Sequence, residues 1–587
     1  MSVPAHAAGG ANRGEPADHA SHFWLATALA AAAWVASILG LVASSPRLLA
    51  AFHGFLHSGV ATRFPSPTLV PENPYFAGEP IRYYWFYHWV GSLVSRGLGL
   101  DQIHAFQFIA LASLTLLVVT GALIGRHLYR STAAGLMVGY LALVGMNPLG
   151  PVIAVAKALL TGALLWEHSL AAPAGDVFVS NPQADALLAR PLLGAMHVGT
   201  DWQSSQDLVW FFDVSSRGPS IALLMLLAWL MVGPRSWWTL PGVALTGALT
   251  AALNPIVGFS AAGTLVAAAV LVRVAGSRWP RLTGPAGHDL LDSVVFTVGV
   301  ALAWPLYSNI FAVHDTVLLT LDRWFVIKTA NIVAGFLVLL PLAVWGVLKA
   351  PGGDGPRAGV ATLTLASLFL VGVVPFVGLY EINQHNFVNA ASCLLAVPAA
   401  AWVVQGRSAS TAVVLRRSLW LAAAFVPMTV GLFLAFGGRG EIPLRASGGE
   451  LRRLPADGPV ARFYDWVATT TTPDAVLVVD PDEPVKMSGN VTEIPAMTRR
   501  AVFTDHVTYM NESYEDLDMR RDLARRAVGG QPLTGADRDY LAALHRPVYV
   551  VSFRADRAAE RERLVASFGE PAFAHGFGAA VQLATPK

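Results

Sequence analysis

Long apolar runs alternate with short polar segments along most of this chain. The first run, residues 22–43, contains no Asp, Glu, Lys or Arg and is long enough to cross a bilayer core of ~30 Å as a helix. Similar runs continue to residue 437 and predict about eleven membrane-spanning helices. We expect these spans near 22–44, 104–125, 132–149, 219–234, 239–254, 257–275, 290–311, 329–348, 360–379, 388–405 and 418–437. The apolar run 151–166 is interpreted as a helix at the outer membrane face. The alternative is that it crosses the membrane too, which would reverse the side of all later segments unless another short span is lost.

Composition supports a polytopic membrane protein. Hydrophobic residues make up 54% of the chain, charged residues 13%, and mean hydropathy is +0.51. Soluble domains usually have about 25% charged residues. The net charge is only +2 and no long Lys/Arg-rich run is present, so we expect membrane lipids rather than nucleic acid as partners. The one cysteine, Cys393, rules out a disulfide framework and a Cys-ligated metal site within one chain.

The charges between the apolar runs predict the orientation. The loops on the side of the N-terminus carry basic residues and few carboxylates, as the positive-inside rule requires of cytoplasmic loops. These residues are Arg126, Arg130, Arg235, Arg273, Arg278, Arg281, Lys349, Arg357, Arg407, Arg416 and Arg417. A cytoplasmic N-terminus and an odd number of spans then place all residues after 438 on the extracytoplasmic side.

The chain changes character at residue 439, where charges become scattered between short β-rich runs. Residues 475–480, 547–553 and 576–583 predict strands, and 514–528 and 557–568 predict amphipathic helices. The expected fold class is therefore mainly α, with a transmembrane helical bundle and a C-terminal α/β domain. We expect three parts: a disordered tail at 1–21, a transmembrane domain at 22–438, and a soluble domain at 439–587.

The polar motifs fall almost entirely on the predicted outer side. The first outer loop, FHGFLHSGVATRFPSPTLVPENPYFAGEPIRYYWFYHW at 52–89, combines many ionisable and aromatic groups. Later outer segments contribute SSRGPS at 215–220 and YEINQHNF at 380–387. Ionisable groups near membrane depth are costly and are usually paired or functional. Their one-sided clustering predicts one outward-facing cavity, although any single loop residue is more simply explained by exposure to water.

The order of these motifs resembles the GT-C superfamily of membrane glycosyltransferases, especially its YYY-type membrane-protein branch. The resemblance is carried by the first loop, SSRGPS and EINQHNF. It implies a bacterial inner-membrane protein that takes a sugar from a polyprenyl-phosphate donor and transfers it to a saccharide, lipid or protein acceptor. The family usually has an Asp or Glu soon after the first span, acting as base or metal ligand. Residues 44–57 contain no carboxylate, so the mechanism of this chain departs from that pattern.

Four residues are candidates for the catalytic role. His53 and His57 are four positions apart and would share one face of a helix, where imidazole suits general-base work or metal ligation. Glu72 and Glu79 flank the turn-rich PENPYFAGEP and would be held by its prolines. The simpler alternatives are that the two histidines lie at the membrane surface without a catalytic role and that the two glutamates only hold the loop in shape. Whether a divalent metal serves as cofactor stays open.

Other residues are candidates for substrate binding. Arg82 and Arg217 suit bidentate contact with phosphate, although either side chain could instead extend to lipid headgroups. Tyr84 and His88 belong to an aromatic run that fits a sugar-binding face or an interfacial aromatic belt. Glu381 and His385 lie between two predicted spans. A transporter or flippase of lipid-linked saccharides, or a non-catalytic scaffold of envelope assembly, are the alternative functions.

Overall fold

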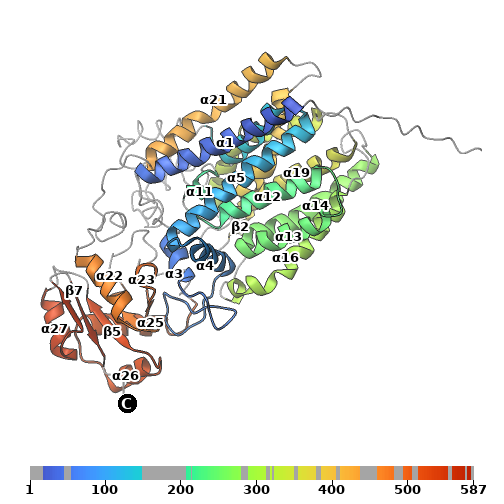
Figure 1. Ribbon diagram of the computed structural model, residues 1–587. Coiled ribbons are helices and arrows are strands. Elements are labelled where there is room, and N and C mark those ends of the chain that lie inside the picture. Colours follow the sequence, from blue (N-terminus) through green and yellow to red (C-terminus); the bar gives the residue numbers. More distant parts are fainter. Residues whose placement is uncertain are drawn as a thin grey trace, which may run out of the picture.

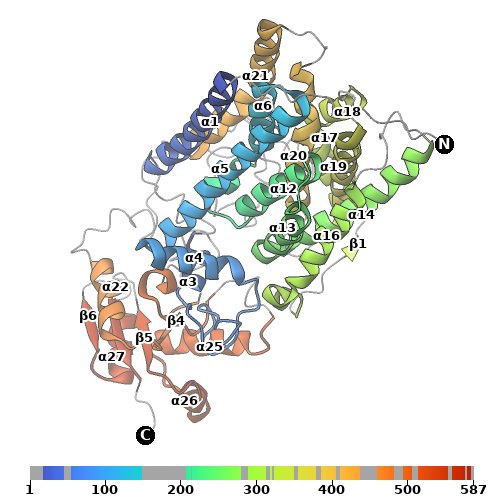
Figure 2. The same cartoon turned by 45° about the vertical axis from the view of Figure 1, so that its right-hand side comes forward.

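The protein is an elongated helical bundle with a small α/β domain at one end (Figures 1 and 2). The computed structural model describes residues 17–44, 54–148, 207–212, 214–278, 288–312, 318–319, 323–349, 354–378, 385–404, 410–436, 459–481, 494–505, 513–552, 558–575 and 578–583. The predicted fold class, mainly helical with a C-terminal α/β domain, is confirmed. Residues 1–16 of the predicted tail at 1–21 and the apolar run 151–166 lie outside the described residues. Residues 17–21 belong to α1, so the helix begins earlier than predicted.

The bundle contains most of the helices. They are α1 (Ala17–Ser44), α5 (Gln102–Tyr129), α6 (Thr132–Val144), α11 (Val209–Phe212), α12 (Arg217–Val232), α13 (Thr239–Leu253), α14 (Pro255–Arg278), α16 (Asp289–Leu302), α17 (Arg323–Phe336), α18 (Leu339–Lys349), α19 (Asp354–Val373), α20 (His385–Ala399) and α21 (Thr411–Phe436). Two helices of the first loop, α3 (Gly54–Ala61) and α4 (Phe86–Leu98), lie between the bundle and the C-terminal domain (Figure 1).

Contacts between helix ends show that neighbouring helices run in opposite directions. Arg126 near the end of α5 stacks over Phe23 near the start of α1. Asn254, after α13, donates to Ser216, before α12. Arg235, after α12, pairs with Asp292 at the start of α16, at the opposite end of the bundle. The first loop and the C-terminal domain share an apolar cluster and lie at the same end of the bundle (Figure 1). The predicted odd number of spans stays a prediction.

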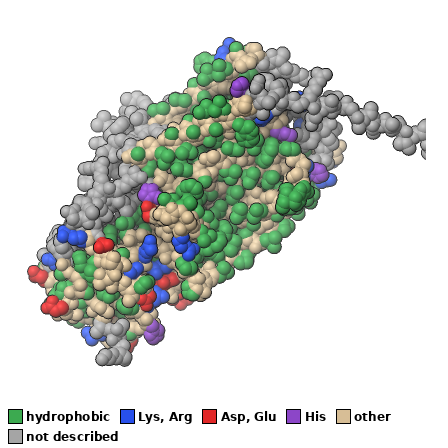
Figure 3. All heavy atoms as spheres, viewed as in Figure 1, with side chains coloured by type: hydrophobic (Ala, Val, Ile, Leu, Met, Phe, Trp, Pro, Cys, Tyr) green, Lys and Arg blue, Asp and Glu red, His purple; other side chains and the backbone are tan. Residues whose placement is uncertain are grey.

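In the part of the chain that the structure describes, five helices are long and apolar enough to cross a membrane. They cover Ser21–Ala43, Gln102–Tyr129, Pro255–Arg278, Arg357–Phe376 and Asn386–Val404, and all five coincide with predicted spans. Four shorter apolar helices coincide with other predicted spans. Hydrophobic side chains cover the bundle in Figure 3, whereas most charged side chains on that face lie toward the C-terminal domain. The total of about eleven spans stays a prediction.

One predicted span is broken. The apolar run 329–348 forms two helices, α17 and α18, which are separated by Leu337 and Val338. Pro341 is the third residue of α18, and its ring would clash with the carbonyl group four residues earlier in a continuous helix. Hydropathy did not register this break because proline is compatible with an apolar run.

The close packing of α5 against α6 depends on small residues. Gly125 of α5 faces Gly135 of α6, and a Cβ at Gly125 would come within 2.3 Å of the Gly135 Cα. One turn earlier on α5, a Cβ at Gly121 would come within 2.8 Å of the backbone nitrogen of Gly139. Membrane helices often associate through such stripes because dispersion contacts replace the hydrophobic driving force.

The C-terminal domain is built on a five-stranded sheet in the order β4-β3-β5-β7-β6. The strands are β3 (Val476–Val478), β4 (Ala501–Val502), β5 (Val548–Ser552), β6 (Phe573–His575) and β7 (Gly578–Gln582). Its helices are α22 (Pro459–Thr470), α23 (Ile494–Thr498), α25 (Leu517–Val528), α26 (Gly535–Ala542) and α27 (Ala558–Phe568). Three predicted strands and both predicted helices are confirmed, whereas β4, β6, α22, α23 and α26 were not predicted.

The two faces of this sheet have different covers. Side chains alternate between the faces along each strand, so Val476 and Val478 pack toward α25 and α27 in one apolar cluster. Leu477, between them, packs in another cluster with α22 and with the first loop. The first-loop members of that cluster are Phe55, Leu56, Val60, Phe64, Tyr75, Ile81 and Trp85. The predicted separate domain therefore shares its core with the loop after the first span.

The first loop also pairs with an edge of the sheet. The Ala77 N–H donates to the Val502 carbonyl at 3.0 Å, and the Val502 N–H donates to the Pro74 carbonyl at 2.9 Å. These bonds satisfy backbone groups of β4 that would otherwise form an open edge. The loop is thus fixed on one side by the sheet and on the other by the bundle.

Candidate functional site

A polar network joins the first loop to two helix ends of the bundle. The Tyr84 hydroxyl lies 2.7 Å from the Ser216 Oγ, and the Tyr83 hydroxyl donates to Tyr84 at 2.8 Å. The Asn254 side chain donates to Ser216 at 3.3 Å. Tyr84, Ser216 and Asn254 are all buried. Three segments far apart in sequence therefore meet at one point. We call these residues, together with Arg217, His57 and His88, the bundle-side cluster.

Arg217 is the first residue of α12 and is only 6% exposed. Its guanidinium carbon lies 4.0 Å from the centre of the Trp210 ring, a cation–π contact. Burial raises the pKa of the Tyr84 phenol, and the hydrogen bonds with Ser216 and Tyr83 and the charge of Arg217 oppose that shift. The N-terminus of a helix carries partial positive charge, so a cation there does not stabilise the helix. The partial positive charge of the helix N-terminus and the guanidinium charge of Arg217 both favour a bound anion.

The loop leading to α12 is conformationally strained. Val214 is fully buried and has a φ of 49°, in the left-handed region that a β-branched residue rarely adopts. Its carbonyl accepts a hydrogen bond from the Tyr87 hydroxyl at 2.8 Å. Strain of this kind persists only where the surrounding structure enforces it, and it is frequent at functional sites.

His57 and His88 form a buried pair between α3 and α4. The His57 Nδ1 lies 2.9 Å from the His88 Nε2, and both side chains are fully buried. Burial lowers the pKa of His88 to about 3, against an opposing effect of the Trp85 and Tyr84 backbone. His88 is therefore neutral at physiological pH, and one of the two facing nitrogens donates while the other accepts.

Glu72 faces the C-terminal domain. Its Oε1 accepts the Gly78 N–H at 2.8 Å and forms a hydrogen-bonded ion pair with Arg546. Its Oε2 lies 3.7 Å from Arg63. Glu79 is partly exposed, and no side-chain hydrogen bond to it is present among the described residues. The two predicted acids therefore differ, because one is held in ion pairs and the other is not.

Arg82 also faces the C-terminal domain. Its guanidinium donates to the Ser513 carbonyl and lies 4.3 Å from the centre of the Tyr514 ring. Tyr514 stacks on Phe76 with ring centres 4.3 Å apart. We call these contacts, together with Glu72, Arg63 and Arg546, the junction. No contact between Arg82 and Arg217 occurs in the part of the chain that the structure describes.

The predicted site residues thus separate into two groups. His57, Tyr84, His88 and Arg217 come together in the bundle-side cluster, whereas Glu72 and Arg82 lie in the junction. Glu79 is on the junction side as well, since burial raises the pKa of the Tyr514 phenol and the charge of Glu79 adds to this effect. His53 and Glu381 lie outside the described residues, and His385 begins α20 but its side chain is not described. The catalytic and binding roles assigned to these residues stay predictions.

Some polar residues of the site were not among the sequence candidates. They include Ser216 and Arg63, and, outside the site, the α20 partners of Asp207. Asp207 is buried, accepts a hydrogen bond from Asn389 at 2.6 Å and another from Ser392. The SSRGPS motif places two serines before an apolar run that has a proline in its first turn. This pattern predicts a helix start, so the position of Ser216 just before α12 was predictable.

A metal site is not apparent in the described part of the chain. No group of three or more His, Cys, Asp or Glu side chains there is arranged to hold a metal ion. Whether the protein uses a divalent metal is thus still an open prediction.

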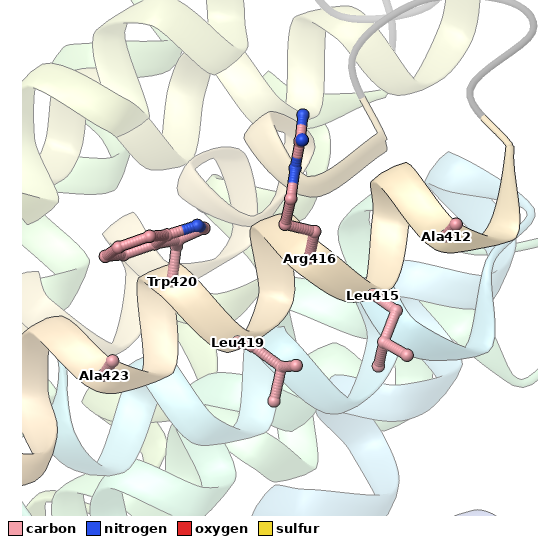
Figure 4. A pocket seen from close by; sticks show the side chains of 6 residues that line it. All are labelled: Ala412, Leu415, Arg416, Leu419, Trp420 and Ala423. Carbon is pink, nitrogen blue, oxygen red and sulfur yellow. The ribbon is translucent and has the colours of Figure 1, made fainter.

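A shallow hollow lies elsewhere, on the outer face of α21 (Figure 4). It is lined by Ala412, Leu415, Arg416, Leu419, Trp420 and Ala423, all from this one helix. Leu415, Leu419 and Trp420 are 57%, 61% and 69% exposed, as expected of side chains that face lipid. The hollow lacks the convergent polar groups of a substrate site, so the bundle-side cluster is the better candidate.

Residues 53–218 match the family described as "Uncharacterized membrane protein (DUF2298)". The match supports a resemblance to this membrane-protein family over residues 53–218. They include the first loop, Asp207 and Arg217, and hence most of the bundle-side cluster. No match was found among curated proteins.

Solved structures with a similar arrangement come from two kinds of protein. ArnT from Cupriavidus metallidurans bound to undecaprenyl phosphate is 12% identical, with a TM-score of 0.47 over 97% of this chain and 98% of that chain. The oligosaccharyltransferase AglB from Archaeoglobus fulgidus, in complex with an inhibitory peptide and a dolichol-phosphate, is 12% identical, with a TM-score of 0.36 over 93% and 71%.

Proposed function

We propose that the protein is a membrane glycosyltransferase that takes its sugar from a polyprenyl-phosphate donor at the extracytoplasmic face. The proposal combines the GT-C resemblance of the first loop with the chemistry of the bundle-side cluster. In the reaction, the acceptor hydroxyl oxygen forms a bond to the anomeric carbon and the bond from that carbon to the phosphate oxygen breaks. The polyprenyl phosphate leaves with the electron pair, and a base takes the hydroxyl proton.

Arg217 is the observation that carries this proposal. It is a buried guanidinium at a helix N-terminus, next to a strained loop, at the end of the bundle that holds the first loop. Helix N-termini and guanidinium groups both bind phosphate oxygens. The departing phosphate gains negative charge in the transition state, so a cation positioned there would accelerate the reaction.

Glu79 is the proposed base. A general base must be free to accept a proton, and the Glu72 carboxylate is already engaged by Arg546 and the Gly78 N–H. His88 is a poor base because burial lowers its pKa to about 3. Glu79 lies on the same loop as Tyr84 and is partly exposed. His53 and His57 are the next candidates if Glu79 proves dispensable.

One observation favours the scaffold alternative. The ion pairs of Glu72 link the first loop firmly to the C-terminal domain, as a non-catalytic assembly protein would also require.

The deciding experiment is sugar transfer in nanodiscs from a panel of radiolabelled polyprenyl-phosphate hexoses and pentoses. We expect turnover with one donor, and its loss in Arg217→Ala. Donor binding without turnover across donors and candidate acceptors would favour a flippase, and the absence of both would favour a scaffold.

A further inference from the structure

Arg63 lies in the junction and is buried without hydrogen bonds. Its side chain is 10% exposed, and neither its Nε nor its Nη2 has a partner within the described residues. Its Nη1 lies 3.7 Å from Glu72, which is too far for a hydrogen bond. A buried guanidinium normally has its N–H groups satisfied, because their desolvation is otherwise uncompensated.

Arg500, nearby, shows how this fold satisfies a buried arginine. Its guanidinium donates to the Thr471 hydroxyl, to the carbonyls of Thr498 and Ala468, and to the Thr471 carbonyl, at 2.7–3.1 Å. All four acceptors are neutral, so these hydrogen bonds satisfy the N–H groups of Arg500 but do not neutralise its positive charge. Arg63 has no comparable set of acceptors.

The surroundings of Arg63 carry excess positive charge. Burial lowers the pKa of Arg63, Glu72 opposes this effect, and the charges of Arg546 and Arg500 lower the pKa further. Among the described residues, Glu72 is the carboxylate that contacts Arg63 and Arg546, and its Oε1 is already occupied by Arg546 and by the Gly78 N–H. Two guanidinium groups therefore share one carboxylate.

We propose that Arg63 and Arg546 bind a phosphate-type oxyanion at the junction, at a site separate from the one assigned to Arg217. A guanidinium fork can contact two oxygens of one phosphate, which matches the Nε and Nη2 groups of Arg63. The second negative charge of a phosphate would offset the excess charge of the cluster. Because Arg63 belongs to the first loop and Arg546 to the C-terminal domain, the anion would link these two parts.

The test is titration of the full-length protein, purified in neutral detergent, with inorganic phosphate and pyrophosphate at constant ionic strength. Calorimetry and thermal unfolding are the two readouts. We expect Arg63→Ala to weaken phosphate binding by at least about tenfold, the loss of one charged hydrogen-bonded contact. It should also abolish the phosphate-dependent rise in Tm. Arg546→Ala should have the same direction of effect.

The control is Arg563→Ala, which removes an exposed arginine of α27 that bonds only its own helix. This variant should bind phosphate within about twofold of the wild type. If Arg63→Ala lowers Tm so far that binding cannot be measured, Arg63→Lys and Arg546→Ala decide. Unchanged affinity in both would overturn the proposal. Loss of binding in Arg217→Ala alone would assign the phosphate to the bundle-side cluster and overturn it as well.

A second arm identifies the source of the phosphate. Without free phosphate, nanodiscs containing phosphatidylglycerol should stabilise the wild type relative to phosphatidylcholine nanodiscs if a lipid headgroup is bound, and Arg63→Ala should remove the difference. Stabilisation by free phosphate alone would indicate a soluble ligand. If neither free phosphate nor phosphatidylglycerol gives a stabilisation that depends on Arg63, the proposal is wrong, whatever the transfer assay shows.

Discussion

The bundle-side cluster and the junction are built from the same loop but use its polar residues in opposite ways. In the cluster, Tyr84 and His88 meet residues of the membrane bundle, and Arg217 adds a cation that does not stabilise its own helix. In the junction, Glu72 and Arg82 make ion-pair, hydrogen-bond and cation–π contacts with the C-terminal domain. The cluster therefore presents a buried cation at one end of the bundle, whereas the junction fixes the loop against the C-terminal domain.

The largest expected effect concerns Glu79, the proposed base. Glu79→Gln should reduce sugar transfer by roughly 10²- to 10⁴-fold, the usual contribution of a general base, with Tm unchanged. Single-turnover transfer in nanodiscs measures the rate. Normal transfer in this variant would remove Glu79 from the mechanism and turn attention to His53 and His57.

Arg217→Ala should weaken binding of a polyprenyl-phosphate analogue by about ten- to hundredfold, from the loss of a charged hydrogen-bonded contact worth about 1.5–3 kcal/mol. Arg217→Lys should restore binding only in part, because an ammonium lacks the planar fork. Arg82→Ala is the matched variant and should weaken binding much less, since Arg82 contacts Ser513 and Tyr514. Equal losses in both variants would mean that the two regions share one phosphate site.

Glu72→Gln should act on stability. It removes the carboxylate that faces Arg546 and Arg63, and we expect a loss of about 1–3 kcal/mol in the free energy of unfolding because charged partners are left unpaired. Transfer by the folded fraction should be nearly normal. Denaturant unfolding followed by tryptophan fluorescence measures the first effect, and a fully stable but inactive Glu72→Gln protein would reverse the roles of the two glutamates.

Tyr514→Leu should destabilise the junction by about 1–2 kcal/mol. It removes one aromatic stack, one cation–π contact and the hydroxyl hydrogen bonds with Pro80 and Asn73, but keeps apolar area. Limited proteolysis should then cut faster between the bundle and the C-terminal domain. An unchanged cleavage rate would show that the shared apolar core alone holds the two parts together.

The smallest effect concerns pH. The folded-state pKa of His88 is about 3, below the ordinary 6.5, so the unfolded chain binds this proton more readily. Above about pH 6.5 both states are neutral at His88, and stability should fall as pH decreases from 6.5 toward 3. His88→Gln should reduce this acid sensitivity in Tm measured from pH 7.5 to pH 5 in buffers of equal ionic strength. The same slope in wild type and variant would contradict a buried neutral pair.

Much of the architecture follows from the sequence alone. Residues 22–43 must form a helix because an apolar backbone in lipid has to satisfy its own hydrogen bonds, and α1 lies there. Strands β3 and β5 were predictable because valine-rich runs between turn residues suit a buried sheet. The first loop was recognisable as the site region from its unusual density of ionisable and aromatic residues.

Only the tertiary structure decided which way each residue of that loop faces. Glu72 and Glu79 are equivalent in sequence context, yet Glu72 meets Arg546, 474 positions along the chain. Sequence spacing could not predict that Tyr84 contacts Ser216 or that Asn254 contacts Ser216. The second contact depends on the antiparallel arrangement of α12 and α13. Local pattern determines helices, strands and membrane spans, since these depend on neighbouring residues. The partner of a polar side chain depends on how distant segments pack, and that information is not local.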